Sequence, residues 1–478
     1  MAPPPPPHIV IVTYPAQGHI NPFLQFAQRL IRMGIHVTLS TTVFAHRLML
    51  KANAAGVPRV AGFTITPFSD GYDEHGFRMN HDDMNQYLSD LRTRGSQALR
   101  DILSGCASDG RPVTAVVRNI LLPWVGDVAR ELKLPTALLW IQPAAVLGIY
   151  YHYFHGYKDA ILEKEVVELP GLPPLSRDDL PSFFLPSGSD GDYSFALATC
   201  KEELEKLDEL QPSDQTVLVN TFDALEAETL KAVEIRYTLL GVGPLIPLAL
   251  HDGDDPSDTA FRGDLFENNE NDDIKRWLGS QPNASVVYIS FGSLLNPSKP
   301  QKEEIAKALL ETKRPFLWVI RKKSENEEKE ELDCREELET QGKIVGWCSQ
   351  TEVLNHPSLG CFITHCGWNS TLESICSGVP VVAFPHWTDQ GTNAKLIQDV
   401  WKTGVRVAAG VKDEAGVEVV GSDEFKRCIE IVMDGGEKSD ELRKNAKKWQ
   451  YLAKEASKEG GSSHMNLKSF AEEVVNHQ

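Results

Sequence analysis

The chain has 478 residues, of which 41% are apolar and 24% charged, and its net charge is −19. This length predicts two or three domains, and the composition excludes a wholly disordered chain. A chain this acidic is not expected to bind nucleic acid or an anionic membrane over a broad surface. Any anion must therefore be bound locally, by backbone amides, helix termini or a few cations.

The cysteine pattern and the apolar stretches indicate a reduced, cytoplasmic protein. The eight cysteines include no C-x-x-C pair, which argues against a disulfide scaffold, a zinc ribbon or a dithiol redox centre. The proline run Met1–Pro7 has neither the basic nor the apolar region of a secretory signal. The most apolar stretch, 136–154, is interrupted by Gln142, Pro143 and His152. We interpret that stretch as buried core and expect no stable membrane insertion.

The N-terminal residues are typical of a strand, a loop, a helix and a second strand. A β-rich run covers 8–14, apolar residues recur at helical spacing over 23–31, and 35–42 returns to a strand pattern. The turn Pro15–His19 then lies at the carboxyl end of a strand, where parallel sheets bind ligands. His19 has the pKa range of a general base. The alternative that it only hydrogen-bonds to the helix start stays open.

The strand-and-helix pattern restarts after residue 285, so we predict an α/β protein with two Rossmann-like parallel-sheet domains. The linker between them is recognised by its Asp, Asn and Gly residues and its few apolar ones. The expected parts are an N-terminal domain over 1–245, a linker over 246–273, a C-terminal domain over 274–460 and a closing helix over 461–478.

The segment 364–370, THCGWNS, leaves a predicted strand and enters a predicted helix. Ser370 and Glu373 match the capping-box pattern that marks a helix start. A helix N-terminus with small residues offers free amide groups and a positive dipole end, which suits a diphosphate. His365 and Asn369 could add side-chain donors to the same oxygens. Glu373 either completes the cap or accepts hydrogen bonds from ribose hydroxyls, and both interpretations stay open.

Three further side chains could contact a ligand in the same region. Trp347 follows a strand on a loop, where its ring could stack on a flat base, although a tryptophan in this place is more often core. Asp389 and Gln390 follow the strand pattern 379–384, and they could bind sugar hydroxyls or only begin a helix.

Several common motifs are missing from the sequence. It has no Walker-type phosphate loop, no G-x-G-x-x-G and no G-x-S-x-G. Two Asp-x-Asp triplets, 190–192 and 252–254, lie in turn-rich stretches. A metal-held diphosphate is therefore disfavoured, and we expect no metal site.

Residues 347–390, WCSQTEVLNHPSLGCFITHCGWNSTLESICSGVPVVAFPHWTDQ, resemble the 44-residue signature (PSPG) box of plant family 1 UDP-dependent glycosyltransferases. The opening TYPAQGHINP resembles the catalytic loop of the same family, and the resemblance covers essentially the whole chain. It implies a GT-B fold, in which two Rossmann-like domains face each other across a cleft. The N-terminal domain would bind the acceptor and the C-terminal domain the UDP-sugar, with the closing helix crossing back to the first domain.

The resemblance also implies a donor site. Trp347 would stack on uracil beside Gln350, and Glu373 would bind the ribose. The segment around His365 would bind the diphosphate. The box positions of Trp368 and Gln390 favour glucose over glucuronate or galactose in this family. The full expected donor set is Ser293, Trp347, Cys348, Gln350, His365, Gly367, Trp368, Asn369, Ser370, Glu373, Asp389 and Gln390.

The implied catalytic residues are His19, as general base, and Asn119. The family usually has Asp where this chain has Asn119. Asn can accept a hydrogen bond from the histidine but cannot stabilise imidazolium by charge, so His19 should be a weaker base. This favours acidic phenols or carboxylic acids as acceptors. The residues expected to contact the acceptor are Gln17, Trp140, Gln142, His386 and Trp387.

The resemblance therefore implies an inverting, metal-independent O-glucosyltransferase of plant secondary metabolism, in the branch of glucose-ester and flavonoid 5-O-glucosyltransferases. It would act as a monomer on UDP-glucose and a phenolic, flavonoid or carboxylic acid acceptor, without a cofactor, and give a β-glucoside. Two alternatives stay open. One is a UDP-sugar epimerase on the same fold, and the other is a catalytically weak UDP-sugar-binding protein, which Asn119 suggests.

Overall fold

The computed structural model contains two compact units. Unit 1 comprises residues 1–175, 183–267 and 455–478, and unit 2 comprises residues 176–182 and 268–454. Most of the expected linker, 248–270, and both Asp-x-Asp triplets lie outside the described residues. The described residues are 6–52, 60–78, 81–184, 194–211, 215–233, 236–247, 271–293, 295–321, 332–412 and 418–476.

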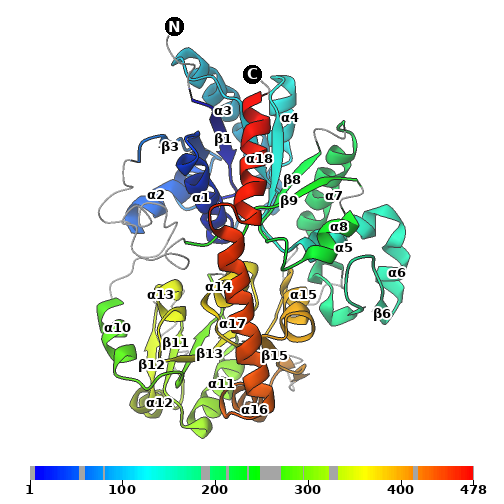
Figure 1. The fold of residues 1–478 in the computed structure, drawn as a ribbon. Helices are drawn as coiled ribbons and strands as arrows, with labels where there is room; N and C mark the ends of the chain where they lie inside the picture. Colours follow the sequence, from blue (N-terminus) through cyan, green and yellow to red (C-terminus); the bar gives the residue numbers. More distant parts are fainter. Residues whose placement is uncertain are drawn as a thin grey trace. The chain divides into compact units, whose positions relative to one another are not determined.

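Within the described residues, unit 1 contains a seven-stranded parallel sheet of order β3-β2-β1-β4-β5-β8-β9 (Figure 1). Every residue of β1, HIVIV, is buried, as expected for a strand whose sheet is covered on both faces. The strands are β1 (His8–Val12), β2 (His36–Ser40), β3 (Phe63–Ile65), β4 (Ala115–Asn119), β5 (Thr136–Trp140), β8 (Thr216–Val219) and β9 (Thr238–Gly241).

The helices of unit 1 bury their apolar faces in the cores of this unit. Phe23 and Phe26 of α1 pack in the same core as Leu467 and Phe470 of the last helix, α18. The helices are α1 (Gln17–Arg32), α2 (Val43–Ala52), α3 (Met84–Ser108), α4 (Trp124–Glu131), α5 (Ala144–His152), α6 (Lys158–Glu163), α7 (Ser194–Asp208), α8 (Ala227–Val233) and α18 (Ser462–Asn476).

In the part of unit 2 that the structure describes, six parallel strands form a sheet of order β12-β11-β10-β13-β14-β15 (Figure 1). The strands are β10 (Val286–Ser290), β11 (Phe316–Val319), β12 (Lys343–Val345), β13 (Leu359–Thr364), β14 (Val381–Ala383) and β15 (Gly404–Arg406). The helices are α10 (Asn271–Gly279), α11 (Lys299–Thr312), α12 (Arg335–Gln341), α13 (Gln350–Leu354), α14 (Trp368–Ser377), α15 (Gln390–Lys395), α16 (Ser422–Met433) and α17 (Glu437–Ser457).

Short elements complete the described chain. Two small sheets pair β6 with β7 and β16 with β17. Their strands are β6 (Val166–Val167), β7 (Leu175–Ser176), β16 (Val411–Lys412) and β17 (Glu418–Val419). Single turns of 3₁₀-helix lie at Arg177–Asp179 and Ser182–Phe184, and a π-helical turn lies at Leu396–Val400. The segment Tyr153–Tyr157 is a kink between α5 and α6, in which His155 and Gly156 have non-helical backbone angles.

Each large sheet reverses its strand order once. In unit 1, β1 lies between β2 on one side and β4 on the other, and the strand order runs outward from β1 in both directions. In unit 2, β10 lies in the same way between β11 and β13. The loops after β1 and β4, and those after β10 and β13, therefore flank a topological switch point. Doubly wound sheets bind their ligands at such points.

The apolar stretch 136–154 is core, as its composition predicts. It forms β5 and α5, and almost all of its residues through His152 are buried. None of the helices in the described residues is both long enough and apolar enough to cross a membrane.

Candidate active site

In unit 1, His19 lies in the first turn of α1, and Asn119 is the last residue of β4. Because β1 and β4 are neighbours in the sheet, the two side chains meet although they are 100 residues apart in sequence. His19 Nδ1 lies 2.9 Å from Asn119 Nδ2 and 3.2 Å from Asn119 Oδ1. The backbone N–H of Leu121 donates to Asn119 Oδ1 at 3.0 Å, which fixes the orientation of the amide.

Two hydrogen-bond arrangements fit these distances. In one, His19 Nδ1–H donates to Asn119 Oδ1, which leaves a lone pair on Nε2 that can accept a proton. In the other, Asn119 Nδ2 donates to an unprotonated Nδ1, so the proton of the neutral ring lies on Nε2. Only the first arrangement makes Nε2 a base. An aspartate would enforce it, because a carboxylate only accepts hydrogen bonds.

The surroundings of His19 keep its ring neutral at physiological pH. Burial lowers the pKa of His19 to about 4, and the hydrogen bond with Asn119 opposes that shift only in part. The ring of Tyr14 lies beside it, with centroids 5.3 Å apart. The hydrogen bond of the His19 ring goes to Asn119 rather than to the start of α1.

In unit 2, His365 follows β13 and lies between two glycines. A Cβ atom on Gly292 would lie 2.7 Å from the His365 ring, and one on Gly367 would lie 2.6 Å from it, so neither position has room for a side chain. Burial lowers the pKa of His365 to about 3, with smaller effects from His386 and Arg321. The ring is therefore a neutral hydrogen-bonding group at physiological pH.

The helix after His365 begins earlier than the capping-box pattern predicts. Helix α14 starts at Trp368, and its N-cap is Gly367, which has no side chain to form a capping bond. The chain leaves β13 through Cys366, whose φ of +64° is left-handed, and it reaches helical conformation before Ser370. Because the first amides of a helix have no partner within it, the start of α14 offers N–H groups to an anion.

Glu373 does not complete a cap, which corrects one of its two interpretations. Its Oε2 accepts a hydrogen bond from Gln350 Nε2 at 2.5 Å, and the same nitrogen lies 2.8 Å from Ser370 Oγ. Tyr288 Oη donates to Gln350 Oε1 at 3.3 Å. Tyr288, on the apolar strand β10, was not expected in the site. Its polar oxygen within a buried strand is the signal that could have identified it.

The aromatic residues of the predicted donor set differ in exposure. Trp347 is half-buried on the loop after β12, so its ring is not wholly part of the core. Cys348, next to it, is buried with its sulfur 3.5 Å from Tyr288 Oη. Trp368 is buried and packs against Trp401, with ring centroids 6.0 Å apart. Cys348 and Trp368 therefore support the loops around them.

The two polar residues after β14 are both buried. The carboxylate of Asp389 accepts hydrogen bonds from Thr388 Oγ1 and Asn393 Nδ2, each at 2.8 Å. Gln390 Oε1 accepts the backbone N–H groups of His386 and Trp387 at 2.9 and 3.2 Å. Asp389 is the N-cap of α15 but makes no capping bond, so its carboxylate does not serve the helix start.

Comparison with known proteins identifies the family. A family model described as "UDP-glucoronosyl and UDP-glucosyl transferase" matches residues 258–436. The "Crocetin glucosyltransferase, chloroplastic" of Gardenia jasminoides is 58% identical over 475 residues, which are 98% of this chain and 97% of that protein. The "Anthocyanidin 3-O-glucoside 5-O-glucosyltransferase" of Verbena hybrida is 54% identical over 98% of this chain and 99% of that one. The chain belongs to the UDP-glycosyltransferase family.

A solved structure agrees with this assignment. The crystal structure of Os79 from O. sativa in complex with UDP matches with a TM-score of 0.82 and 35% identity, over 98% of this chain and 100% of that one. The chain described here is therefore a transferase with the GT-B fold, which confirms the predicted fold class and family.

The residues predicted to bind the acceptor fall in both units of the UDP-glycosyltransferase. In unit 1, Gln17 and Gln142 are half-buried, whereas Trp140 is 1% exposed and its Nε1–H donates to Pro143 O at 3.0 Å. In unit 2, His386 is exposed and Trp387 is half-buried. Trp140 packs in the interior, so any effect on the acceptor would come from holding the loop after β5.

Two charged groups that were not expected from the sequence hold loops next to predicted site residues. The carboxylate of Glu226 accepts the first two amides of α5, from Ala144 and Ala145, at 2.9 and 2.8 Å. Arg321, just after β11, donates to the carbonyl oxygen of Ser293. Burial lowers the pKa of Arg321. Arg321 could have been identified from the sequence as a cation at the carboxyl end of a strand beside β10. No sequence feature distinguishes Glu226.

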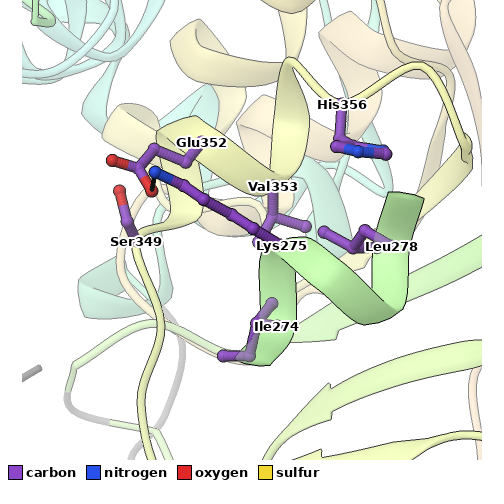
Figure 2. Close-up of a pocket in the computed structure, with 7 residues that line it drawn as sticks. All are labelled: Ile274, Lys275, Leu278, Ser349, Glu352, Val353 and His356. Carbon is purple, nitrogen blue, oxygen red and sulfur yellow. Dashed lines mark ion pairs between the residues drawn. The ribbon is translucent and has the colours of Figure 1, made fainter. Parts of the chain in front are cut away.

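Unit 2 also contains a cavity of about 280 Å³ between α10 and α13. Figure 2 shows the ion pair between Lys275 and Glu352, 3.0 Å apart, among its lining side chains. The other residues that line it are Ile274, Leu278, Ser349, Val353 and His356. This cavity includes none of the predicted donor residues.

Proposed function

We propose that this enzyme transfers glucose from UDP-glucose to a hydroxyl or carboxyl group of a small plant metabolite, with inversion at the anomeric carbon. The observation that carries the proposal is the neutral His365 beside the start of α14, whose N-cap is a glycine, in a chain 58% identical to a glucosyltransferase. These groups suit the diphosphate of a sugar nucleotide.

In this proposal unit 2 binds the donor. Trp347 stacks on the uracil, and Glu373 accepts hydrogen bonds from the ribose. The amides at the start of α14 and the His365 ring bind the diphosphate and stabilise it as it leaves. Asp389 and Gln390 bind the glucose hydroxyls, because their buried oxygens are already oriented by the turn that carries them.

Unit 1 supplies the base in this proposal and binds the acceptor. The acceptor oxygen attacks the anomeric carbon from the face opposite UDP, and its proton moves to His19 Nε2 as the bond to UDP breaks. Because the glucose of UDP-glucose is α-linked, the product is a β-glucoside. An acceptor that is a carboxylate at neutral pH brings no proton and makes no demand on His19.

The chemistry around Asn119 favours acidic acceptors. With an amide in place of a carboxylate, imidazolium at His19 is not stabilised by charge, so removing a proton from a weakly acidic alcohol is slow. Phenols, flavonoids and carboxylic acids need less help. The names of the two relatives, which act on crocetin and on an anthocyanidin glucoside, agree with this range.

A second candidate function is a UDP-sugar-binding protein with weak catalysis. The observation that favours it is that His19 Nδ1 lies nearer to Asn119 Nδ2, at 2.9 Å, than to Oδ1, at 3.2 Å. That geometry suits the ring form whose Nε2 carries the proton and cannot act as a base.

The experiment that separates these functions measures UDP release and product mass. The enzyme is incubated with UDP-glucose and a panel of flavonoids, simple phenols and carboxylic acids. A product heavier by one hexose supports the proposed transfer, and its sensitivity to alkali distinguishes an ester from an ether. UDP binding without any product would favour the second function, and a changed sugar nucleotide without acceptor would indicate an epimerase.

We also propose that the enzyme is a cytoplasmic monomer. All eight cysteines lie in the described residues and none forms a disulfide, as is usual in a reducing compartment. Light scattering on the purified protein should give the mass of one chain, and a fluorescent fusion should fill the cytoplasm. Import into plastids would overturn the cytoplasmic assignment, and the Gardenia relative, named as chloroplastic, makes that outcome the one to examine.

A further inference from the structure

Unit 2 contains seven residues from far earlier in the chain. The segment Ser176–Ser182 belongs to unit 2, whereas the residues on either side of it, Leu175 and Phe183, belong to unit 1. More than 200 residues separate this segment from the turn that it contacts.

The segment hydrogen-bonds to the residue before Asp389. The backbone N–H of Ser182 donates to Thr388 O at 2.9 Å, and Ser182 Oγ accepts the N–H of Thr388 at 2.8 Å. Thr388 has a left-handed φ of +57°, which is unfavourable for a β-branched residue. Two hydrogen bonds to its backbone therefore hold a conformation that the residue would not adopt alone.

The strained residue is connected directly to the carboxylate that follows it. Thr388 Oγ1 donates to Asp389 Oδ1 at 2.8 Å, and Asn393 Nδ2 donates to the other oxygen at the same distance. A change in the backbone of Thr388 would therefore move the Asp389 carboxylate.

The same segment is anchored at a second point along α15. Thr392 Oγ1 donates to Asp179 O at 2.6 Å. The carboxylate of Asp179, only 5% exposed, forms ion pairs with Arg406 at 2.6 Å and Lys395 at 3.7 Å. A Cβ atom on Gly391 would lie 2.4 Å from the carbonyl oxygen of Asp178, so the absence of a side chain there permits this close packing.

We propose that the segment Ser176–Ser182 positions the turn 388–391 so that Asp389 and Gln390 can bind the glucose of the donor. Ser182 and Asp179 are its positioning residues. The inference rests on the proposed function, because it assigns the glucose to this turn. The residues proposed to bind the uridine and the diphosphate lie on other loops of unit 2. The segment should therefore affect binding of the sugar and not binding of the nucleotide.

The test compares Ser182→Ala with wild type. Loss of the hydroxyl removes the hydrogen bond to Thr388, and KM for UDP-glucose should rise about tenfold or less with a smaller change in kcat. The affinity for UDP, which has no sugar, should stay within about twofold of wild type. Preference for UDP-glucose over UDP-galactose should fall. Ser182→Thr, which keeps the hydroxyl, should restore KM, and Ser280→Ala, an exposed hydroxyl deletion in the same unit, should behave as wild type.

Two outcomes would overturn the inference. One is an unchanged KM for UDP-glucose and an unchanged sugar preference in Ser182→Ala, and the other is an equal loss of UDP affinity, which would mean that the segment only supports the fold. Gly391→Ala provides a second variant, since its Cβ would clash with the carbonyl oxygen of Asp178 and push the segment away from the turn. If wild type turns over no acceptor, the proposed function fails, yet titration of UDP-glucose against UDP still measures the effect of the segment on the sugar.

Discussion

The two groups of predicted site residues, one in each unit, are built in different ways on similar sheets. Nearly all of the donor residues in unit 2 come from one stretch, 347–390, and they contact one another over short sequence distances, as Gln350 does with Ser370 and Glu373. The catalytic pair in unit 1 joins residues 100 apart through the pairing of β1 with β4. A local segment therefore brings together the proposed donor residues, whereas the fold of the whole sheet brings together the proposed base and its partner.

The two groups also differ in redundancy. The proposed donor side has many groups, including the amides of α14, the His365 ring and the network around Gln350. The His19 side has one titratable ring and one partner, Asn119. Changes in unit 2 should therefore weaken donor binding by degrees, whereas a change at His19 should abolish the chemistry and leave donor binding intact.

The largest expected effect is that of His19→Ala. Without a base, kcat/KM for a phenolic acceptor should fall by about 10²–10⁴, whereas UDP affinity measured by calorimetry should equal that of wild type. The exposed His81 provides the matched control, and His81→Ala should keep full activity. Wild-type turnover in His19→Ala would remove His19 as the base.

The next largest effect is expected for Gly367→Ala, which disturbs the proposed diphosphate site without removing any hydrogen-bonding group. The new Cβ would lie 2.6 Å from His365 Nε2, so the ring must move, and the affinity for UDP should fall about tenfold. Gly421→Ala is the control, because a Cβ there meets nothing within 4 Å. Equal UDP affinity in both variants would contradict the assigned place of His365.

The smallest effect, and the one that best resolves the histidine side, is a shift in pH dependence in Asn119→Asp. Wild-type kcat/KM should fall only as the pH drops through about 4, the pKa of His19, because the protonated ring can no longer act as a base. A carboxylate beside the ring stabilises imidazolium and raises that pKa, so the acid limb of the variant should move to higher pH. Its rate with weakly acidic alcohols should rise up to about tenfold. Superimposable profiles would show that residue 119 does not tune His19.

The sequence predicted the fold class and the family because a single continuous stretch carries the donor signature. It also indicated His19 from its place after the first strand, whereas Asn119 entered only through the resemblance, since two residues 100 apart show no local pattern. The capping box at Ser370 was wrong in detail. The left-handed Cys366 allows the chain to become helical at Trp368, three residues earlier than the pattern implies.

Other features could not have been predicted from one sequence. The hydrogen bonds between Ser182 and Thr388 span 206 residues and involve no periodic pattern. The same holds for the Glu226 carboxylate at the start of α5, which lies 82 residues from Ala144. Both contacts depend on how loops pack after the sheets have formed, and loop packing has no signature in residue spacing.

The most direct test of the central claim is the anomeric configuration of the product made from UDP-glucose. The glucoside formed with an accepted phenol or carboxylic acid is purified, and the coupling of its anomeric proton is measured by NMR. A single displacement assisted by His19 requires the β-anomer. An α-glucoside would contradict the account, because retention needs a different mechanism from the one proposed for His19 and the start of α14.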